Sequence, residues 1–160
     1  MLLANTRHYI FLSSYRIYSS NELPIRETSP RMLEAYTHDT EYQSHDKDEY
    51  SLYKCRQEDV LHACELKNWT IVRPTITFSK YRFQLVTLEA PILIHRAMAG
   101  KTVLLPELAM DIQATMSWAG DVGKMFTRLV LNPKAYAESF SICTAEHHTW
   151  REIAALRVDV

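Results

Sequence analysis

Two short apolar runs, at residues 8–13 and 69–73, constrain the fold of this chain more than any other feature. Neither run alternates regularly with polar residues, and a continuous apolar run is typical of a strand buried on both faces. The residues from about Asp48 to Leu66 have the length and the acidic start expected of a helix. Strand, helix and strand in this order favour parallel pairing. We therefore predict two neighbouring parallel strands with the helix packed across them.

Tyr50 and Lys54 lie four residues apart on this predicted helix, which places the phenol and the ammonium side by side. A phenol with a pKa of about 10 is a poor base at neutral pH, and a fixed cation beside it stabilises the phenolate. The pair is therefore a candidate acid/base site. Two simpler interpretations stay open: such a pair arises readily by chance, and Lys54 is within reach of Glu58 one turn further on.

The side of the helix that faces the core is predicted to be an apolar stripe next to the candidate pair. Glu58 shares the face of Tyr50 and Lys54 in this interpretation, so core packing leaves the pair accessible. The predicted stripe consists of Tyr53, Val60, Leu61 and Cys64.

Ser14 follows the first apolar run directly after Ser13. Open α/β sheets bind ligands at the carboxyl ends of their strands, so Ser14 is a candidate site residue. A serine at such a position also forms turns by bonding nearby backbone, and this alternative stays open.

Composition and charge describe an ordinary globular protein of 160 residues, 47% hydrophobic and 23% charged, with one core. A formal net charge of −1 gives no general attraction to nucleic acid or to anionic membranes. No stretch approaches the roughly 20 apolar residues that span a bilayer. The three cysteines, Cys55, Cys64 and Cys143, form no Cys-x-x-Cys pair. They therefore predict neither a disulfide scaffold nor a zinc site, and they favour a reducing, cytoplasmic setting.

Residues 19–49 are rich in polar and acidic side chains, and we predict a loop there with one helical turn at residues 31–35. His38 and His45 lie in this loop without the spacing of a metal site, so no metal is expected. Further along the chain, Thr149 and Glu152 have the spacing of a capping box and start a last helix, and the adjacent His147 and His148 are assigned no chemistry. The other elements predicted after Pro74 are a loop at 75–79, a helix at 88–99 ending at Gly100, a short strand at 101–106, a helix at 121–131 and a strand at 139–143.

Several short motifs follow one another in a fixed order: Ser13-Ser14 with Tyr18 four residues later, Tyr50-x-x-x-Lys54, and Arg73-Pro74 at a strand end. With these motifs the chain resembles the extended short-chain dehydrogenase/reductase family, in particular its NAD-dependent epimerase/dehydratase group acting on nucleotide sugars. The resemblance covers nearly the whole chain, because it continues through residues 118–122 and 146–153.

The resemblance implies an α/β fold with a partial Rossmann-type parallel sheet. Residues 1–75 would form the second half of a nucleotide-binding domain, and residues 76–160 a partial substrate-binding lobe. It implies that Ser14 orients the substrate oxygen, Tyr50 transfers the proton, and Lys54 lowers the pKa of the phenol and bonds the nicotinamide ribose. The implied cofactor is NAD or NADP, and its implied contacts are Tyr50, Lys54, Pro74 and Thr75.

The sequence departs from the family in two places. Whole enzymes of this type begin with a strand, a Gly-x-x-Gly-x-x-Gly turn and a helix that holds the pyrophosphate, whereas this chain has three glycines and none follows an N-terminal strand. The chain thus resembles a C-terminal portion. We predict that alone it binds NAD weakly or not at all, and that it associates with a missing nucleotide-binding half or with itself. Ile76 stands where relatives acting on nucleotide sugars often carry asparagine, which weakens that substrate assignment.

Two functions follow as hypotheses. The first is a fragment of an NAD(P)-dependent epimerase/dehydratase-type oxidoreductase acting on a nucleotide sugar or a related hydroxyl or carbonyl substrate. The alternative is a non-catalytic truncated or split-partner protein of the same fold. Relatives that bind RNA exist, but the nearly neutral charge of this chain gives that function little support.

Overall fold

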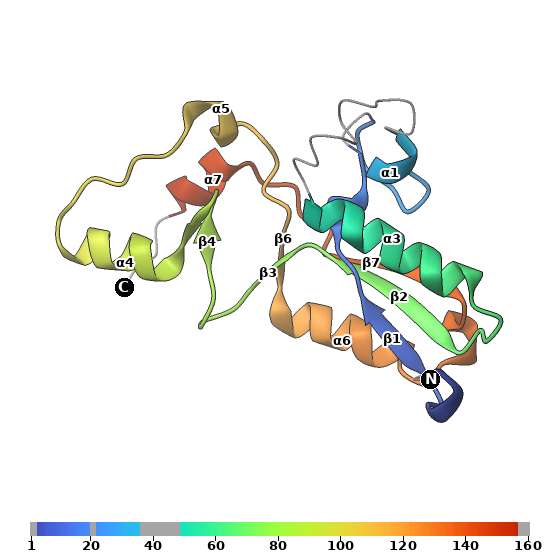
Figure 1. Ribbon diagram of the computed structural model, residues 1–160. Coiled ribbons are helices and arrows are strands. Elements are labelled where there is room, and N and C mark those ends of the chain that lie inside the picture. The colour runs from blue at the N-terminus through green and yellow to red at the C-terminus, as the bar shows by residue number, and fades with distance from the viewer. Residues whose placement is uncertain (1–2, 20–21, 36–48, 157–160) are drawn as a thin grey trace. The chain divides into compact units, whose positions relative to one another are not determined.

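The computed structural model describes residues 3–19, 22–35 and 49–156, and its contacts divide the chain into two units (Figure 1). The first unit comprises Met1–Thr75 and Lys124–Ile142, and the second comprises Ile76–Gly123 and Cys143–Val160. The sequence prediction also places a boundary after residue 75. The segment Lys124–Ile142, which that prediction assigns to the second half of the chain, has its contacts with the first unit.

A three-stranded parallel sheet in the order β1-β2-β7 forms the centre of the first unit. β1 (Tyr9–Leu12) pairs with β2 (Trp69–Pro74), and β2 pairs with β7 (Glu138–Ile142). The central strand β2 is buried along its length up to Arg73, as expected of a strand covered on both faces. The predicted parallel pair of strands is confirmed.

The predicted helix is confirmed as α3 (Glu49–Ala63), which connects β1 to β2 and packs against the sheet where Leu61 meets Trp69 and Ile71. On the other side of the sheet lies α6 (Ala119–Leu129), the helix predicted at 121–131 (Figure 1). The described residues of the first unit also form four short helical pieces, and the last of them confirms the turn predicted at 31–35. They are η1 (Leu3–Asn5), η2 (Tyr15–Ile17), η3 (Pro133–Ala135) and α1 (Met32–Ala35).

Of the four positions in the predicted core stripe of α3, only Leu61 is a buried residue of the helix, so the predicted stripe is wrong. Tyr53 and Val60 are 50% and 66% exposed, and Cys64 lies beyond the helix end. A fully buried Glu58 occupies the core-facing side instead, because Arg73 pairs with its charge. The residues of α3 that are buried are Ser51, Leu52, Cys55, Glu58 and Leu61.

The described residues of the second unit form two small sheets and three helices around a core of Met110, Ala114 and Trp150. The helix predicted before Gly100 is confirmed, and Gly100 itself has a φ of 63° that favours glycine. The elements are β3 (Ile76–Phe78) parallel to β6 (Met116–Trp118), β4 (Gln84–Leu85) antiparallel to β5 (Leu88–Glu89), and the helices α4 (Ala90–Met98), α5 (Glu107–Met110) and α7 (Trp150–Ala155).

Two predictions in the second unit are wrong. The expected loop at 75–79 contains strand β3, because residues 76–78 pair with β6. The expected strand at 101–106 forms no strand, since none of the described residues pairs with it. The predicted capping box is confirmed, with the Thr149 hydroxyl and the Glu152 carboxylate bonding each other's backbone N–H groups.

The predicted metal-free loop with His38 and His45 lies outside the described residues. Within the described ranges, no helix is both long enough and apolar enough to cross a membrane.

Candidate active site

The carboxyl ends of β1 and β2 lie at the same edge of the sheet, and the predicted site residues follow these ends. Ser14 comes two residues after β1, while Pro74 ends β2 and Thr75 follows it. The two strands are in register, with Leu12 opposite Val72. This edge is where open α/β sheets bind ligands.

Ser14 is nearly buried and begins the short helix η2. Its hydroxyl oxygen accepts a hydrogen bond of 3.2 Å from the backbone N–H of Arg16. The turn role considered from the sequence is therefore present, and the same bond fixes the hydroxyl at the sheet edge. The neighbouring Ser13 hydroxyl is buried and has no hydrogen-bond partner among the described residues.

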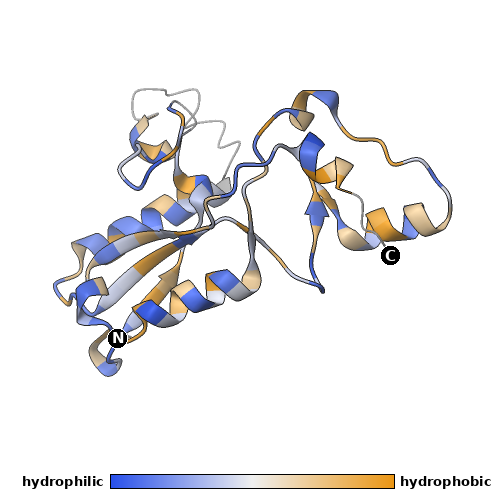
Figure 2. Cartoon of the chain, turned by 180° about the vertical axis from the view of Figure 1, so that it is seen from behind, coloured by the Kyte–Doolittle hydropathy of each residue, from blue (hydrophilic) through white to orange (hydrophobic). Residues whose placement is uncertain are grey.

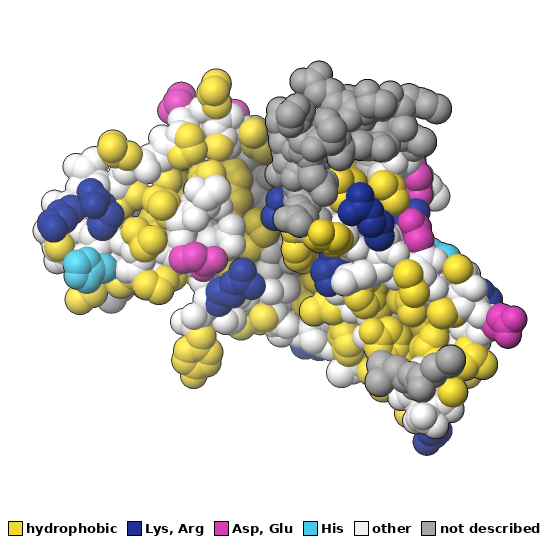
Figure 3. Space-filling view, viewed as in Figure 1, with side chains coloured by type: hydrophobic (Ala, Val, Ile, Leu, Met, Phe, Trp, Pro, Cys, Tyr) yellow, Lys and Arg dark blue, Asp and Glu magenta, His cyan; other side chains and the backbone are white. Residues whose placement is uncertain are grey.

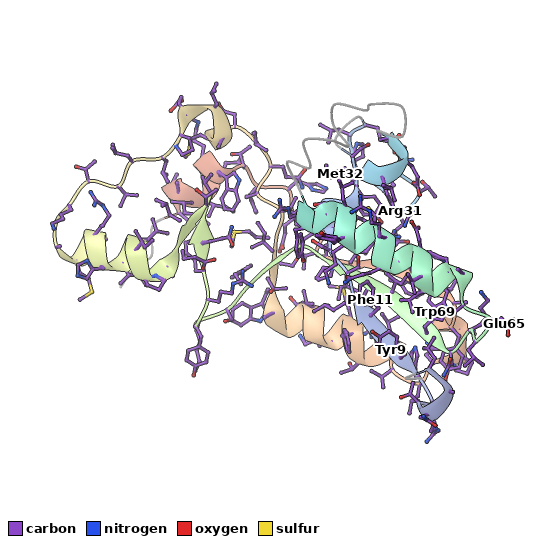
Figure 4. All side chains as sticks on the ribbon, in the orientation of Figure 1. Tyr9, Phe11, Arg31, Met32, Glu65 and Trp69 are labelled. Carbon is purple, nitrogen blue, oxygen red and sulfur yellow. The ribbon has the colours of Figure 1, made fainter. Side chains whose placement is uncertain are left out.

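Lys54 reaches from α3 to the end of β1. Its ammonium donates a 2.8 Å hydrogen bond to the carbonyl of Leu12 and lies 4.8 Å from the ring centre of Phe11, which Figure 4 labels on β1. The simpler interpretation, in which Lys54 forms an ion pair with Glu58 on the helix surface, is wrong because Glu58 is buried and paired with arginines. Lys54 is thus held at the edge where the predicted site lies.

Tyr50 lies in the first turn of α3 with 48% of its surface exposed. The Lys54 ammonium is 5.8 Å from the centre of its ring, and the guanidinium carbon of Arg16 is 5.5 Å from it. Tyr50 and Lys54 therefore lie close together, and both Lys54 and Ser14 lie at the carboxyl end of β1. Pro74, at the end of β2, is in register with Ile142 at the end of the neighbouring strand β7.

A buried ion pair fixes α3 against β2 one turn below Lys54. Arg73 donates two hydrogen bonds to the Glu58 carboxylate, of 2.8 Å from Nη2 and 3.1 Å from Nε. Burial alone would lower the pKa of Arg73, but the hydrogen bonds and charge of Glu58, together with Tyr18, outweigh burial and raise that pKa. The forked geometry is the strong form of a charge-assisted pair.

Tyr18 extends this ion pair to the segment that carries Ser14. Its hydroxyl accepts a 2.7 Å hydrogen bond from Arg73 Nη1 and is 3.1 Å from the hydroxyl of Ser141 on β7. The Tyr18 ring also lies under the guanidinium of Arg73, 5.1 Å away. Arg73 therefore joins the end of η2 to α3, the two elements that position Ser14 and the Tyr50/Lys54 pair.

Arg31 holds the outer side of the same helix. Its guanidinium lies 3.5 Å from Glu58 and donates a 2.7 Å hydrogen bond to Asp59, and Figure 4 shows Arg31 beside α3. Burial opposes its charge, but hydrogen bonds to Glu34 and Asp59 raise its pKa above the usual value for arginine. Two arginines thus share one fully buried carboxylate.

Sequence reasoning missed Arg16, Glu58 and Arg73 as residues that shape this site. Two signals were available: Glu58 follows Lys54 at the same spacing of four that joins Tyr50 to Lys54, and Arg73 ends a run that is otherwise apolar. A charged residue at the end of a buried strand needs a buried partner. No sequence signal marked Arg16.

The residues at this edge fit one end of a dinucleotide cofactor. The Lys54 ammonium is a hydrogen-bond donor at the end of β1, next to a phenol that could exchange a proton with a substrate. Among the described elements none matches the pyrophosphate end, because none of the three glycines follows β1 or forms a turn between a first strand and its helix.

No family model and no curated protein matches this sequence. Solved structures do match: RMD of Pseudomonas aeruginosa complexed with NADPH, at 18% identity and a TM-score of 0.64, covers 91% of this chain and 48% of its own. The UDP-N-acetylglucosamine 4-epimerase of Methanobrevibacter ruminantium, in complex with UDP-N-acetylmuramic acid, is 13% identical with a TM-score of 0.66 over 93% of this chain and 45% of its own. The dTDP-glucose 4,6-dehydratase of Bacillus anthracis, in complex with NAD, is 14% identical with a TM-score of 0.64 over 92% and 43%.

This chain shares the fold of these proteins. The predicted class, a Rossmann-like α/β arrangement with parallel strands, is therefore confirmed. The chain spans less than half the length of each of the three.

Proposed function

We propose that this chain carries the acid/base portion of an NAD(P)-dependent oxidoreductase of the epimerase/dehydratase type. Its substrate would be a nucleotide sugar or a related compound with a reacting hydroxyl or carbonyl. The observation that supports this most is the placement of Ser14, Tyr50 and Lys54 at one edge of a parallel sheet, in a fold shared with enzymes solved with NAD and NADPH.

Each of the three residues has a separate task in this proposal. The Tyr50 phenol moves the proton of the reacting hydroxyl, and the adjacent Lys54 ammonium stabilises the phenolate form. Ser14, held by the backbone of Arg16, orients the reacting oxygen. Bound NAD or NADP would supply hydride transfer at the substrate carbon that carries the reacting oxygen.

The cofactor contacts proposed for this chain lie at the ribose and nicotinamide end only. Lys54 and Tyr50 would bond the ribose side, and Pro74 with Thr75 would line the end of β2. The pyrophosphate site would come from a nucleotide-binding half, on the same polypeptide or on another. We expect weak or no binding of NAD without that half.

An open strand edge and a neighbouring groove support this need for a second half. β1 has a partner on one side only among the described strands, β2, and an unpaired edge invites another strand. Hydrophobic side chains gather over β1 in Figure 3. A groove of about 510 Å³ lies beside it, lined by Leu3, Ala4, Tyr9, Val60, Leu61, Cys64, Glu65 and Leu66.

The test measures NAD binding by calorimetry and hydride transfer by NADH fluorescence, first on this chain alone and then with a nucleotide-binding half supplied. We expect binding and transfer only in the second case. Tight NAD binding by the chain alone would contradict the need for a second half. Full NAD binding by the combined halves without any hydride transfer would instead support the non-catalytic alternative.

A further inference from the structure

His8 lies just before β1 and joins the sheet to the end of α6 through both nitrogens of its imidazole ring. The backbone N–H of Leu131, two residues after α6, donates a 2.9 Å hydrogen bond to Nδ1. Nε2 is 2.8 Å from the hydroxyl oxygen of Thr70 on β2. Figure 1 shows the end of α6 close to the start of β1. One side chain thus links segments that are 123 residues apart in the sequence.

These contacts require a neutral imidazole. A backbone N–H only donates, so Nδ1 of His8 accepts and carries no proton. The proton of the neutral ring is therefore on Nε2, which donates to the Thr70 hydroxyl, and this hydroxyl donates in turn to the carbonyl of Ala135. A second proton on the ring would go to Nδ1, where it would face the N–H of Leu131 instead of an acceptor.

Leu131 depends on this hydrogen bond, because its backbone has an unfavourable conformation. Its φ is 53°, in the left-handed region that residues other than glycine seldom adopt. The last carbonyls of α6, which would attract a histidinium, are already bonded by Asn132. Its backbone N–H donates to Leu129 at 3.2 Å, and its side-chain Nδ2 donates to Arg128 at 3.1 Å.

The charged side chains near His8 in sequence and on the elements that surround it are all exposed, and most are cations. They are Arg7, Lys67, Arg128, Lys134 and Glu138. The ring of Tyr136 lies 4.6 Å from the imidazole, centre to centre. None of the described carboxylates forms an ion pair with His8, and burial lowers the pKa of its imidazole below the usual 6.5. The surroundings therefore favour the neutral form that the hydrogen bonds require.

We propose that His8 is a pH-sensitive latch, which ties the end of α6 to the sheet when it is neutral and releases Leu131 and the turn after it when it is protonated. Protonation places a hydrogen on Nδ1, so two donors face each other and the bond to Leu131 is lost. The left-handed backbone of Leu131 can then relax. The latch lies at the start of β1, whereas Ser14 follows the end of that strand, and it does not rest on the proposed function.

The sign of the pH effect follows from these two states. Because folding favours neutral His8, its pKa is lower in the folded chain than in the unfolded chain. The contribution of the latch to stability is complete above the unfolded-state pKa, and it is lost as the pH falls through the folded-state value. Mild acid should therefore loosen the end of α6 before it affects the rest of the sheet.

The test is an NMR titration of the ¹⁵N-labelled full chain from about pH 8 to about pH 5, a range that spans the titration of histidine. Long-range ¹H–¹⁵N spectra identify the nitrogen that carries the proton, and we expect Nε2 at the upper pH. On acidification, the protection factor of the Leu131 amide should fall about tenfold, the effect of losing one hydrogen bond, while the β2 amides keep theirs. A proton on Nδ1 at the upper pH, or unchanged protection of Leu131, would overturn the proposal.

Two variants separate the charge of His8 from its ring. His8→Asn keeps an oxygen that can accept from Leu131 at every pH, so the loss of protection in acid should disappear. His8→Phe keeps a ring beside Tyr136 but has no acceptor, so protection should be low at both ends of the titration. His95→Asn, on the exposed surface of α4, is the matched control and should respond to acid as the unaltered chain does.

The protection of the β2 amides at the upper pH shows whether each variant is folded. An acid response in His8→Asn equal to that of the unaltered chain would overturn the proposal, and so would full protection of Leu131 in a folded His8→Phe. If His8→Phe does not fold, the titrations of the unaltered chain and of His8→Asn still decide.

Discussion

Ile71 and Leu108 show how the two units of this chain differ. Ile71, on the central strand of the first unit, is completely buried, whereas Leu108, on α5 of the second unit, is 94% exposed. The contrast extends along whole elements: β2 is buried from Trp69 to Arg73, while α4 buries none of its residues although Figure 2 shows much of it as hydrophobic. The first unit therefore holds its site residues on a packed frame, and the second unit offers apolar surface that the described chain leaves uncovered.

This difference indicates where the chain can hold a precise geometry. Catalytic groups need supports that are themselves fixed by packing and hydrogen bonds. In the first unit, Glu58, Arg73 and Tyr18 form such a support beneath Tyr50 and Lys54. The comparable ion pairs of the second unit, from Arg151 to Asp111 and Glu107, lie on the surface.

Removing the buried arginine should have the largest effect. Arg73→Met leaves the Glu58 carboxylate without its forked partner, and breaking a buried pair in this way costs roughly 3–5 kcal/mol. Arg151→Met, which breaks the exposed pairs of the second unit, should leave stability unchanged. Urea unfolding of both variants measures the difference, and equal losses would show that the frame does not depend on the buried pair.

Truncating the buried Ile71 should give the next largest effect, with the exposed Leu108 as its comparison in the second unit. Ile71→Ala removes three carbons from a completely buried site and should lower the free energy of unfolding by about 2–5 kcal/mol. Leu108→Ala removes side-chain atoms that are already in water and should change it by less than about 0.5 kcal/mol. Hydrogen exchange of the β2 amides measures the loss of stability in Ile71→Ala. A similar loss from Leu108→Ala would mean that the apolar surface of the second unit is buried in solution.

Much of this frame could be predicted from sequence, because β1, β2 and α3 follow from apolar runs and from helix length. The buried face of α3 could not, since a helix that buries Ser51 and Glu58 and exposes Tyr53 and Val60 has no apolar stripe to read. The ion pairs of Glu58 with Arg73 and Arg31, which are distant in sequence, make that face suitable for the core.

The candidate site, like the fold of the first unit, could be predicted only in part from the sequence. Ser14, Tyr50 and Lys54 could be named from motifs in one stretch of sequence each, and their gathering at one edge follows from parallel strands. The contact of Arg16 with Tyr50 depends on the path of η2 after β1, which no local pattern specifies. In the second unit, β3 and β6 are three residues each and are stabilised by pairing with one another, so their sequences alone predict neither.

A smaller effect is expected at the start of α7. Thr149→Ala removes the cap that accepts a hydrogen bond from the backbone N–H of Glu152, which typically costs about 1 kcal/mol. The amides of α7 should exchange faster while those of β2 stay unchanged, because the two elements belong to different units. Equal changes in both would show that the units unfold together.

The smallest expected effect is the loss of stability caused by Glu34→Gln, which depends on pH. Burial favours the protonated form of Glu34, but hydrogen bonds from Arg31 outweigh this and lower its pKa. A lowered pKa contributes stability that is present above about pH 4.5 and is lost as the pH falls through the folded-state value. Glu34→Gln should therefore cost a few tenths of a kcal/mol at pH 7 and nothing near pH 2, as unfolding in urea at both pH values would measure. A cost that persists at pH 2 would contradict the ion-pair origin.

The central claim is that Tyr50 is the acid/base group, and Tyr53 on the same helix provides the control because the two tyrosines are almost equally exposed. The decisive measurement is turnover by the chain combined with a nucleotide-binding half, comparing Tyr50→Phe with Tyr53→Phe. We predict that Tyr50→Phe lowers turnover by roughly 10² to 10⁴ with little change in NAD affinity, because only the proton donor is lost, and that Tyr53→Phe changes neither. Normal turnover by Tyr50→Phe would contradict the proposed site.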